Sequence, residues 1–187
     1  MGINVTDKTI WKKYNSEKRN FFDLGFQYAC ADKATPYFCT PKGAKIFATT
    51  GVGGIHYCTI NKYGDLVFAV VPDSCNGRYV FPVAKNLIQF LQLVISLGGT
   101  GLIDRIPFMG RERYDEHVKN PFIDDPPEFV DDIKAAICDA VDELQSLFDV
   151  PPIEGCPYDI VTELYNSFDY SDLEFTAEYY DVLGIEK

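Results

Sequence analysis

The sequence predicts a single α+β domain, with a mostly antiparallel, twisted sheet and helices packed around it. Three observations predict this fold class. The chain has 187 residues, the length of one domain, and 47% of them are hydrophobic, enough for a core of its own. Its middle holds β-rich runs with a period of two, separated by turn signals. Elsewhere apolar residues recur at three- and four-residue steps, which is typical of helices.

Short β-rich runs predict the strands of the sheet. Residues 55–60 and 66–71 flank the turn cluster NKYGD, and we expect them to pair as an antiparallel hairpin. A further short strand is expected at 45–49. The Asn-Gly turn signal in DSCNGRYV predicts another strand at 78–81.

Helices are predicted where apolar residues form one stripe. The clearest stripe lies in the helix expected at 84–97. Gly98 and Gly99 follow it and predict the end of this helix. The longest helix follows Pro126 and Pro127, whose fixed φ angles favour a first helical turn. We expect helices within 1–28 and at 84–97, 111–119, 128–148 and 159–168. Residues 170–187 fit a strand and a helix equally well.

Charge divides the chain into two unequal parts, within a net charge of −11. Residues 1–109 hold 12 Lys and Arg against 7 Asp and Glu, whereas residues 110–187 hold 5 against 21. We therefore expect one domain over 1–187, with a core at about 25–120 and an acidic, helical C-terminal part at about 121–187. Such an excess of carboxylates favours a cationic partner over phosphate. The alternative is that the acids are solvated helix faces that keep the protein in solution.

The stretch GVGGIHYCTI, residues 51–60, raises two site hypotheses. Glycines that hold a nucleotide phosphate open a helix, whereas these open a strand, so we interpret GVGG as a turn with positive φ angles. His56 and Cys58 share one face of a strand, where an imidazole can lower the pKa of a thiol. The alternative is that His56, Cys58 and Ile60 form a buried row of core residues.

No catalytic, cofactor-binding or metal-ligating set is predicted. The six cysteines form no C-x-x-C pair, and the two histidines lie far apart in the chain. The first residues contain no apolar run of signal-peptide length, and no segment has the apolar length of a membrane span. We expect free thiols, a cytoplasmic protein, no cofactor, no membrane contact and no enzyme activity. A hydrolase or transferase that uses Cys58 and His56 is the alternative, and the oligomeric state is left open.

Residues 51–97 contain a glycine-rich turn, two strands, a third strand and the segment RYVFPVAKNLIQFLQLVISLGG. This order, with the pattern v-A-x-[SN]-[FL]-x-x-F-L, resembles the SUKH superfamily, bacterial immunity proteins related to a yeast cell-wall assembly regulator. The family's early L-P-x-x-Y-like motif is replaced here by KATPYFCTPKGAKIFATT. The resemblance implies a non-catalytic α+β domain that binds and neutralises a toxin, or one that serves as a regulatory or ligand-binding scaffold. The positions that match the pattern are Val83, Ala84, Asn86, Leu87, Phe90 and Leu91.

The acidic half is where we expect a basic protein partner to bind, and where we expect no nucleic acid. Toxins that act on nucleic acids are cationic, and an acidic face speeds their capture. On the long predicted helix, at 3.6 residues per turn, Asp132, Asp139 and Glu143 fall close in angle. Asp131 and Asp142 form a second row. The expected partner-binding residues are Asp124, Asp125, Asp131, Asp132, Asp139, Asp142 and Glu143.

Overall fold

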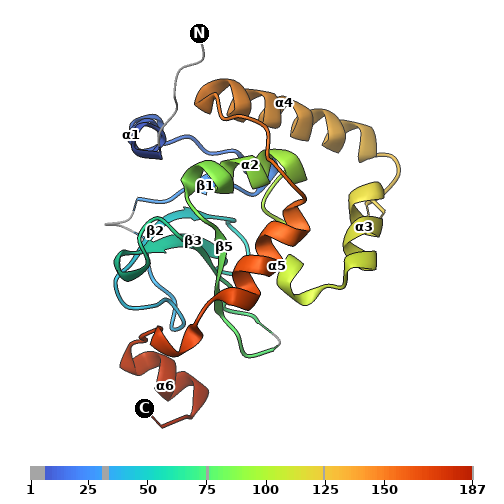
Figure 1. Ribbon diagram of the computed structural model, residues 1–187. Coiled ribbons are helices and arrows are strands. Elements are labelled where there is room, and N and C mark those ends of the chain that lie inside the picture. Colours follow the sequence, from blue (N-terminus) through green and yellow to red (C-terminus); the bar gives the residue numbers. More distant parts are fainter. Residues whose placement is uncertain (1–6, 31–33, 75, 124, 187) are drawn as a thin grey trace.

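The computed structural model describes residues 7–30, 34–74, 76–123 and 125–186. Within them, five strands form one sheet, and each strand pairs antiparallel with the next along the chain (Figure 1). The predicted fold class is confirmed: a single α+β domain with an antiparallel sheet and flanking helices. The strands are β1 (Gln27–Tyr28), β2 (Ala44–Thr49), β3 (His56–Ile60), β4 (Val67–Val70) and β5 (Val80–Ala84).

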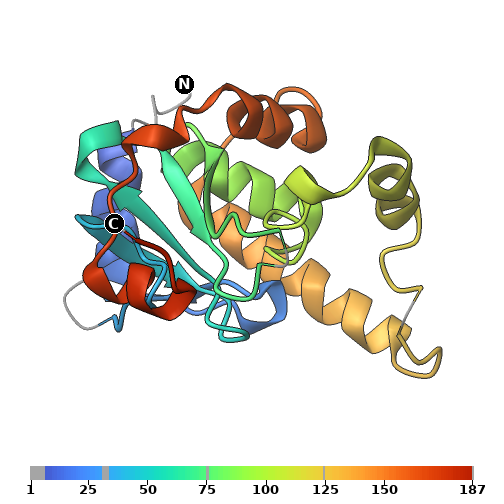
Figure 2. The ribbon, with the colours of Figure 1, turned by 90° about the horizontal axis from the view of Figure 1, so that it is seen from below.

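Helices surround the sheet in the described part of the chain. In Figure 1, α4 crosses above α2, and α5 lies along the edge strand β5. Figure 2 shows that α3 and the first turns of α4 project to one side of the sheet. The α-helices are α1 (Asp7–Glu17), α2 (Leu87–Leu97), α3 (Arg111–Lys119), α4 (Val130–Phe148), α5 (Pro157–Ser167) and α6 (Ala177–Leu183). The 3-10 turns are η1 (Phe22–Leu24), η2 (Asn61–Tyr63), η3 (Ile106–Phe108) and η4 (Tyr170–Asp172).

One face of the sheet carries the larger core. Alternate residues of a strand face opposite sides of the sheet. Tyr57 on β3 and Phe81 on β5 belong to the core on this face, and both are fully buried. Helix α2 covers the face, and the ring of its Phe90 lies 4.6 Å from the ring of Tyr57. The helix begins after Asn86, whose side-chain oxygen accepts a hydrogen bond from the Gln89 backbone N–H at 2.9 Å.

The opposite face carries a smaller core that includes Cys58, Ile60 and Phe68. Residues 168–183, which we term the C-terminal strap, pack against it. The ring of Phe168 in this strap lies 5.3 Å from the ring of Phe68. The strap contains η4 and α6, so the segment whose pattern fitted both strand and helix is helical at 177–183.

The predicted hairpin is confirmed, since His56 pairs with Val70 and Thr59 with Val67 across β3 and β4. The predicted strand at 45–49 and helix at 111–119 are also present, as β2 and α3. The hairpin flanks the turn cluster NKYGD, and α3 lies between the helix breakers Gly110 and Pro121. Their boundaries follow the sequence closely for that reason.

Other boundaries differ from the prediction. The strand expected at 78–81 begins and ends later, and it contains Pro82, because β5 is an edge strand that pairs with β4 alone in this sheet. The core also extends beyond the expected limits of 25–120. Ile10 on α1 and Leu144 on α4 are buried in it, so helices outside those limits complete the domain.

Candidate functional site

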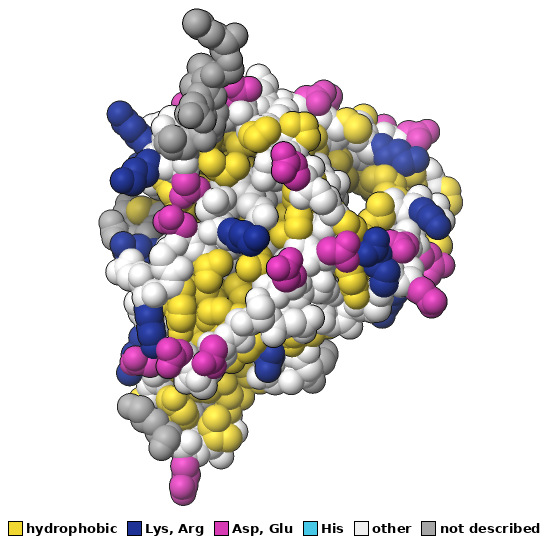
Figure 3. Space-filling view, viewed as in Figure 1, with side chains coloured by type: hydrophobic (Ala, Val, Ile, Leu, Met, Phe, Trp, Pro, Cys, Tyr) yellow, Lys and Arg dark blue, Asp and Glu magenta, His cyan; other side chains and the backbone are white. Residues whose placement is uncertain are grey.

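Helix α4 carries most of the predicted partner-binding carboxylates and displays them to solvent. Lys134 is the one basic residue of this helix. Figure 3 shows acidic side chains along the upper edge of the molecule, over α4, and basic side chains gathered on the left, over α1. The acidic residues of α4 are Asp131, Asp132, Asp139, Asp142 and Glu143, and all are exposed.

An apolar hollow of about 450 Å³ lies beside the first turns of α4. Asp23 borders it from η1, which packs against α4, and Asp132 borders it from α4 itself. Hydrocarbon walls flanked by carboxylates match the stem and head of a Lys or Arg side chain, because such side chains bury the stem and keep the charge at the edge. The residues that line the hollow are Asp23, Phe129, Asp132, Ile133, Ala136 and Ile137.

The remaining predicted acids differ in their surroundings. Glu143 forms an ion pair with Arg19, and both side chains are about half exposed, so the pair adds little to stability. Asp125 is half-buried ahead of α4, whereas Asp124 lies outside the described residues. The carboxylates of α4 that form no ion pair with any described residue are those of Asp131, Asp132, Asp139 and Asp142.

The row on β3 is buried. Cys58 is 0% exposed, and burial raises the pKa of its thiol to about 12. The ring of His56 is also buried, with Nδ1 2.8 Å from the Gly54 carbonyl oxygen and Nε2 3.1 Å from the Thr40 hydroxyl. Burial lowers the pKa of His56, so its ring is neutral at pH 7. A thiol held protonated in the core is not activated as a nucleophile, and the geometry favours the buried row of core residues.

The GVGG segment is a turn with positive φ angles, as predicted: Gly51, Gly53 and Gly54 have φ of 77°, 59° and 69°. It leads into β3 rather than into a helix. The turn faces a second glycine-rich loop, residues 98–101, across a cleft of about 410 Å³. The tertiary fold thus brings two glycine-rich loops together at one end of the sheet.

Asp104 lines this cleft and was not predicted as a site residue. It is 8% exposed, and desolvation raises the pKa of its carboxyl to about 6, against smaller opposing effects of its own backbone N–H and of Arg105. A lone carboxylate within the apolar run GLIDRIP is the sequence signal that marks it. Asp23, which borders both the cleft and the hollow on α4, has no such signal, because its place depends on tertiary packing.

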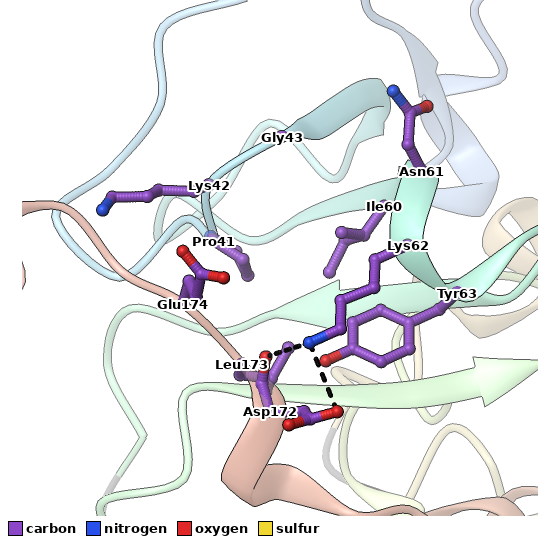
Figure 4. Close-up of a pocket in the computed structure, with 10 residues that line it drawn as sticks. All are labelled: Pro41, Lys42, Gly43, Ile60, Asn61, Lys62, Tyr63, Asp172, Leu173 and Glu174. Carbon is purple, nitrogen blue, oxygen red and sulfur yellow. Dashed lines mark hydrogen bonds and ion pairs between the residues drawn. The ribbon is translucent and has the colours of Figure 1, made fainter.

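A smaller cavity of about 220 Å³ lies where the C-terminal strap crosses η2 and the start of β2 (Figure 4). The Nζ of Lys62 lies 3.2 Å from the Oδ2 of Asp172, and the backbone N–H of Lys42 donates to the Glu174 carbonyl oxygen at 2.8 Å. The hydroxyl of Tyr63 is buried without a hydrogen-bond partner among the described residues. One exposed ion pair and one backbone hydrogen bond therefore join the strap to the sheet here, beside the apolar contacts of Phe168.

Of the helices in the described part of the chain, none combines the length and the apolar character needed to cross a membrane. Within the same ranges, no group of three or more His, Cys, Asp or Glu side chains is arranged to hold a metal ion. The five cysteines that the structure describes are unpaired. Comparisons of the chain with protein-family models, with curated proteins and with solved structures found no match.

Proposed function

We propose that this chain is a non-catalytic binding protein that captures a basic protein through the acidic surface of α4. The observation that carries the proposal is the hollow in which Asp23 and Asp132 flank an apolar floor. A Lys or Arg side chain of the partner packs its stem against Ile133 and Ile137 there. Its charged head pairs with the two carboxylates through charge-assisted hydrogen bonds.

The surroundings of the hollow support this assignment. Phe129 at the start of α4 and Phe22 beside Asp23 are 54% and 67% exposed, and exposed aromatic side chains of this kind are typical anchors of protein interfaces. The unpaired carboxylates farther along α4 add a negative field, which speeds association with a cationic protein. The same field opposes the approach of nucleic acid phosphates to this face.

The identity of the partner follows from the resemblance of residues 51–97 to the SUKH superfamily. We propose that the partner is a toxin and that this chain is its immunity protein in the cytoplasm. Toxins that act on nucleic acids carry a cationic surface for phosphate. Carboxylates of α4 occupy that surface in the proposed complex, and the toxin then loses access to its substrate.

A comparison of two charge-neutralised variants tests the proposal. The first variant changes Asp132, Asp139 and Asp142 on α4 to Asn. The second is a matched control that removes the same charge elsewhere, through Glu163→Gln on α5 with Glu178→Gln and Asp181→Asn on α6, all exposed. The proteins captured from native lysate by the wild type and both variants are quantified at low and at high salt.

The proposal predicts a basic protein that binds the wild type and the control variant, weakens as salt rises, and is lost from the α4 variant. Identical capture by the two variants would contradict it, because the acids of α4 would then serve solubility alone. A partner that is itself acidic would contradict it as well.

A further inference from the structure

The cleft between the GVGG turn and the loop 98–101 has the dimensions of a small-ligand site. Its volume of about 410 Å³ falls in the range of roughly 300–1,000 Å³ that such sites occupy. Its walls are fixed to one another, since the backbone N–H and the hydroxyl of Thr100 donate to the carbonyl oxygens of Leu24 and Gly25, each at 2.8 Å. A Cβ on Gly99 would lie 2.9 Å from the Leu24 carbonyl oxygen, so this close approach requires glycine.

Two carboxylates and the C-terminal end of a helix border the cleft. The carboxylate of Asp104, in a residue 92% removed from solvent, forms no ion pair with any described residue. Asp23 also lines the cleft, and α2 ends against it at Gly98, where the last carbonyl groups of a helix attract cations. Arg105 is the basic residue of the lining, and it is exposed.

We propose that this cleft binds a small molecule with a primary aliphatic ammonium group, which pairs with the carboxylate of Asp104. An ammonium group carries a full positive charge and three N–H donors, so it can form a charge-assisted hydrogen bond with this carboxylate. Leu24, Val52 and Ile55 line the cleft and provide an apolar wall for the hydrocarbon part of the ligand. Val52 is 73% exposed in the free protein, and the ligand covers it.

A buried carboxylate without an ion-pair partner lowers stability, so its presence at a cleft is typical of a functional position. The inference does not depend on the partner surface of α4, although Asp23 borders both places. Binding of a small amine by the isolated protein is measured without any protein partner. The two proposals therefore stand or fall separately.

Titration of the isotope-labelled protein with n-hexylammonium chloride, followed by amide NMR, tests the proposal. The amide signals of Gly25, Gly98, Gly99 and Gly101 report directly on the cleft walls. 1-Hexanol and hexanoate are matched controls, since they keep the hydrocarbon chain and remove or reverse the charge. We expect saturable shifts of these glycine signals with hexylammonium and none with the two controls.

Two variants give opposite expected results. Asp104→Asn keeps the shape of the side chain and weakens hexylammonium binding by roughly tenfold or more, because a charge-assisted hydrogen bond is lost. Arg105→Gln removes an exposed positive charge and tightens binding. If hexanoate bound instead, and Arg105→Gln weakened it, the assignment of a cation site would be overturned. Shifts that Asp104→Asn leaves unchanged, or an absence of shifts at millimolar hexylammonium, would overturn it too.

The affinity also depends on pH in one direction. The charged or titratable groups around Asp104 are Arg105 on its own loop, Asp23 on η1 and Tyr57 on β3. Burial raises the pKa of Tyr57, so it stays neutral, and hexylammonium stays protonated throughout. Because the pKa of Asp104 is about 6, the affinity falls about tenfold from pH 7.5 to pH 5. An affinity that is constant over this range, or that rises, would contradict the role of Asp104.

Discussion

Asp104 makes the folded protein less stable at neutral pH than an uncharged residue would. Its carboxyl has a pKa of about 6 in the folded state against 3.8 without burial, because desolvation disfavours the charged form. The folded state therefore binds a proton more tightly than the unfolded state. Stability falls as the pH rises from about 4 to about 6, and the loss is complete above that range.

For this reason we expect Asp104→Asn to stabilise the protein most at neutral pH. The free energy of unfolding of the variant, relative to the wild type, should be higher at pH 7.5 than at pH 4.5 by about 2 kcal/mol. Urea unfolding at the two pH values measures it. Asp132→Asn, at an exposed position, is the control and should show no such difference. A variant that is equally destabilised at both pH values would show that Asp104 supports the loop structurally.

The thiol of Cys58 leads to a second prediction at the same scale. Burial raises its pKa to about 12, whereas Cys138 is exposed on α4. Under native conditions near pH 7, iodoacetamide should modify Cys138 first and leave Cys58 unmodified, as peptide mass spectrometry can show. Rapid native modification of Cys58 would contradict the buried row on β3 and would support a cysteine-based activity.

At the scale of elements, the C-terminal strap completes the smaller core of the sheet. Phe168 contacts the rings of Tyr63 and Phe68 at 5.1 and 5.3 Å between centroids. The Lys62–Asp172 ion pair beside it is exposed, with side chains 50% and 63% accessible. Apolar packing is therefore expected to hold the strap, with only a small contribution from the ion pair.

Phe168→Ala should lower the free energy of unfolding by about 2 kcal/mol, because a large, partly buried aromatic side chain is removed. Ile185→Ala is a matched control, since Ile185 is 50% exposed and its truncation should have little effect. Lys62→Gln should also have little effect. Chemical unfolding monitored by circular dichroism compares the three. A larger effect of Lys62→Gln than of Phe168→Ala would reverse the explanation.

Elements with local signals could be predicted from the sequence, and contacts between distant segments could not. The β3–β4 hairpin and α3 follow from short-range patterns. Helix α2 ends at Gly98, because glycine readily adopts the αL conformation of a helix C-terminus. The strap could not be assigned, because LEFTAEYY fits two periodicities and its apolar residues are ordered by the sheet face beneath them. The position of Asp23 beside Asp132 likewise arises only when η1 packs against α4.

At the scale of the whole molecule, one face shows basic and acidic side chains gathered over different helices. Basic side chains gather over α1, and acidic side chains line α4 (Figure 3). The helix is present as predicted and its acids are exposed, whereas their role in binding stays a prediction. The sequence could not show that Arg19 pairs with Glu143. Because this pair neutralises one carboxylate in the last third of α4, the first two-thirds of the helix are the more negative part of that surface. That part also holds the apolar hollow, so charge and apolar surface coincide there.

Amide hydrogen exchange, measured on the protein alone and bound to the captured basic partner, tests the central claim most directly. If the partner binds the acidic surface of α4, exchange should slow in residues 129–143 and 22–25, while the C-terminal strap keeps the rate of the free protein. The first turns of α4 project to one side of the sheet, so changes there are easily separated from those of the sheet (Figure 2). Protection confined to the strap or to the sheet, with α4 unchanged, would contradict the claim.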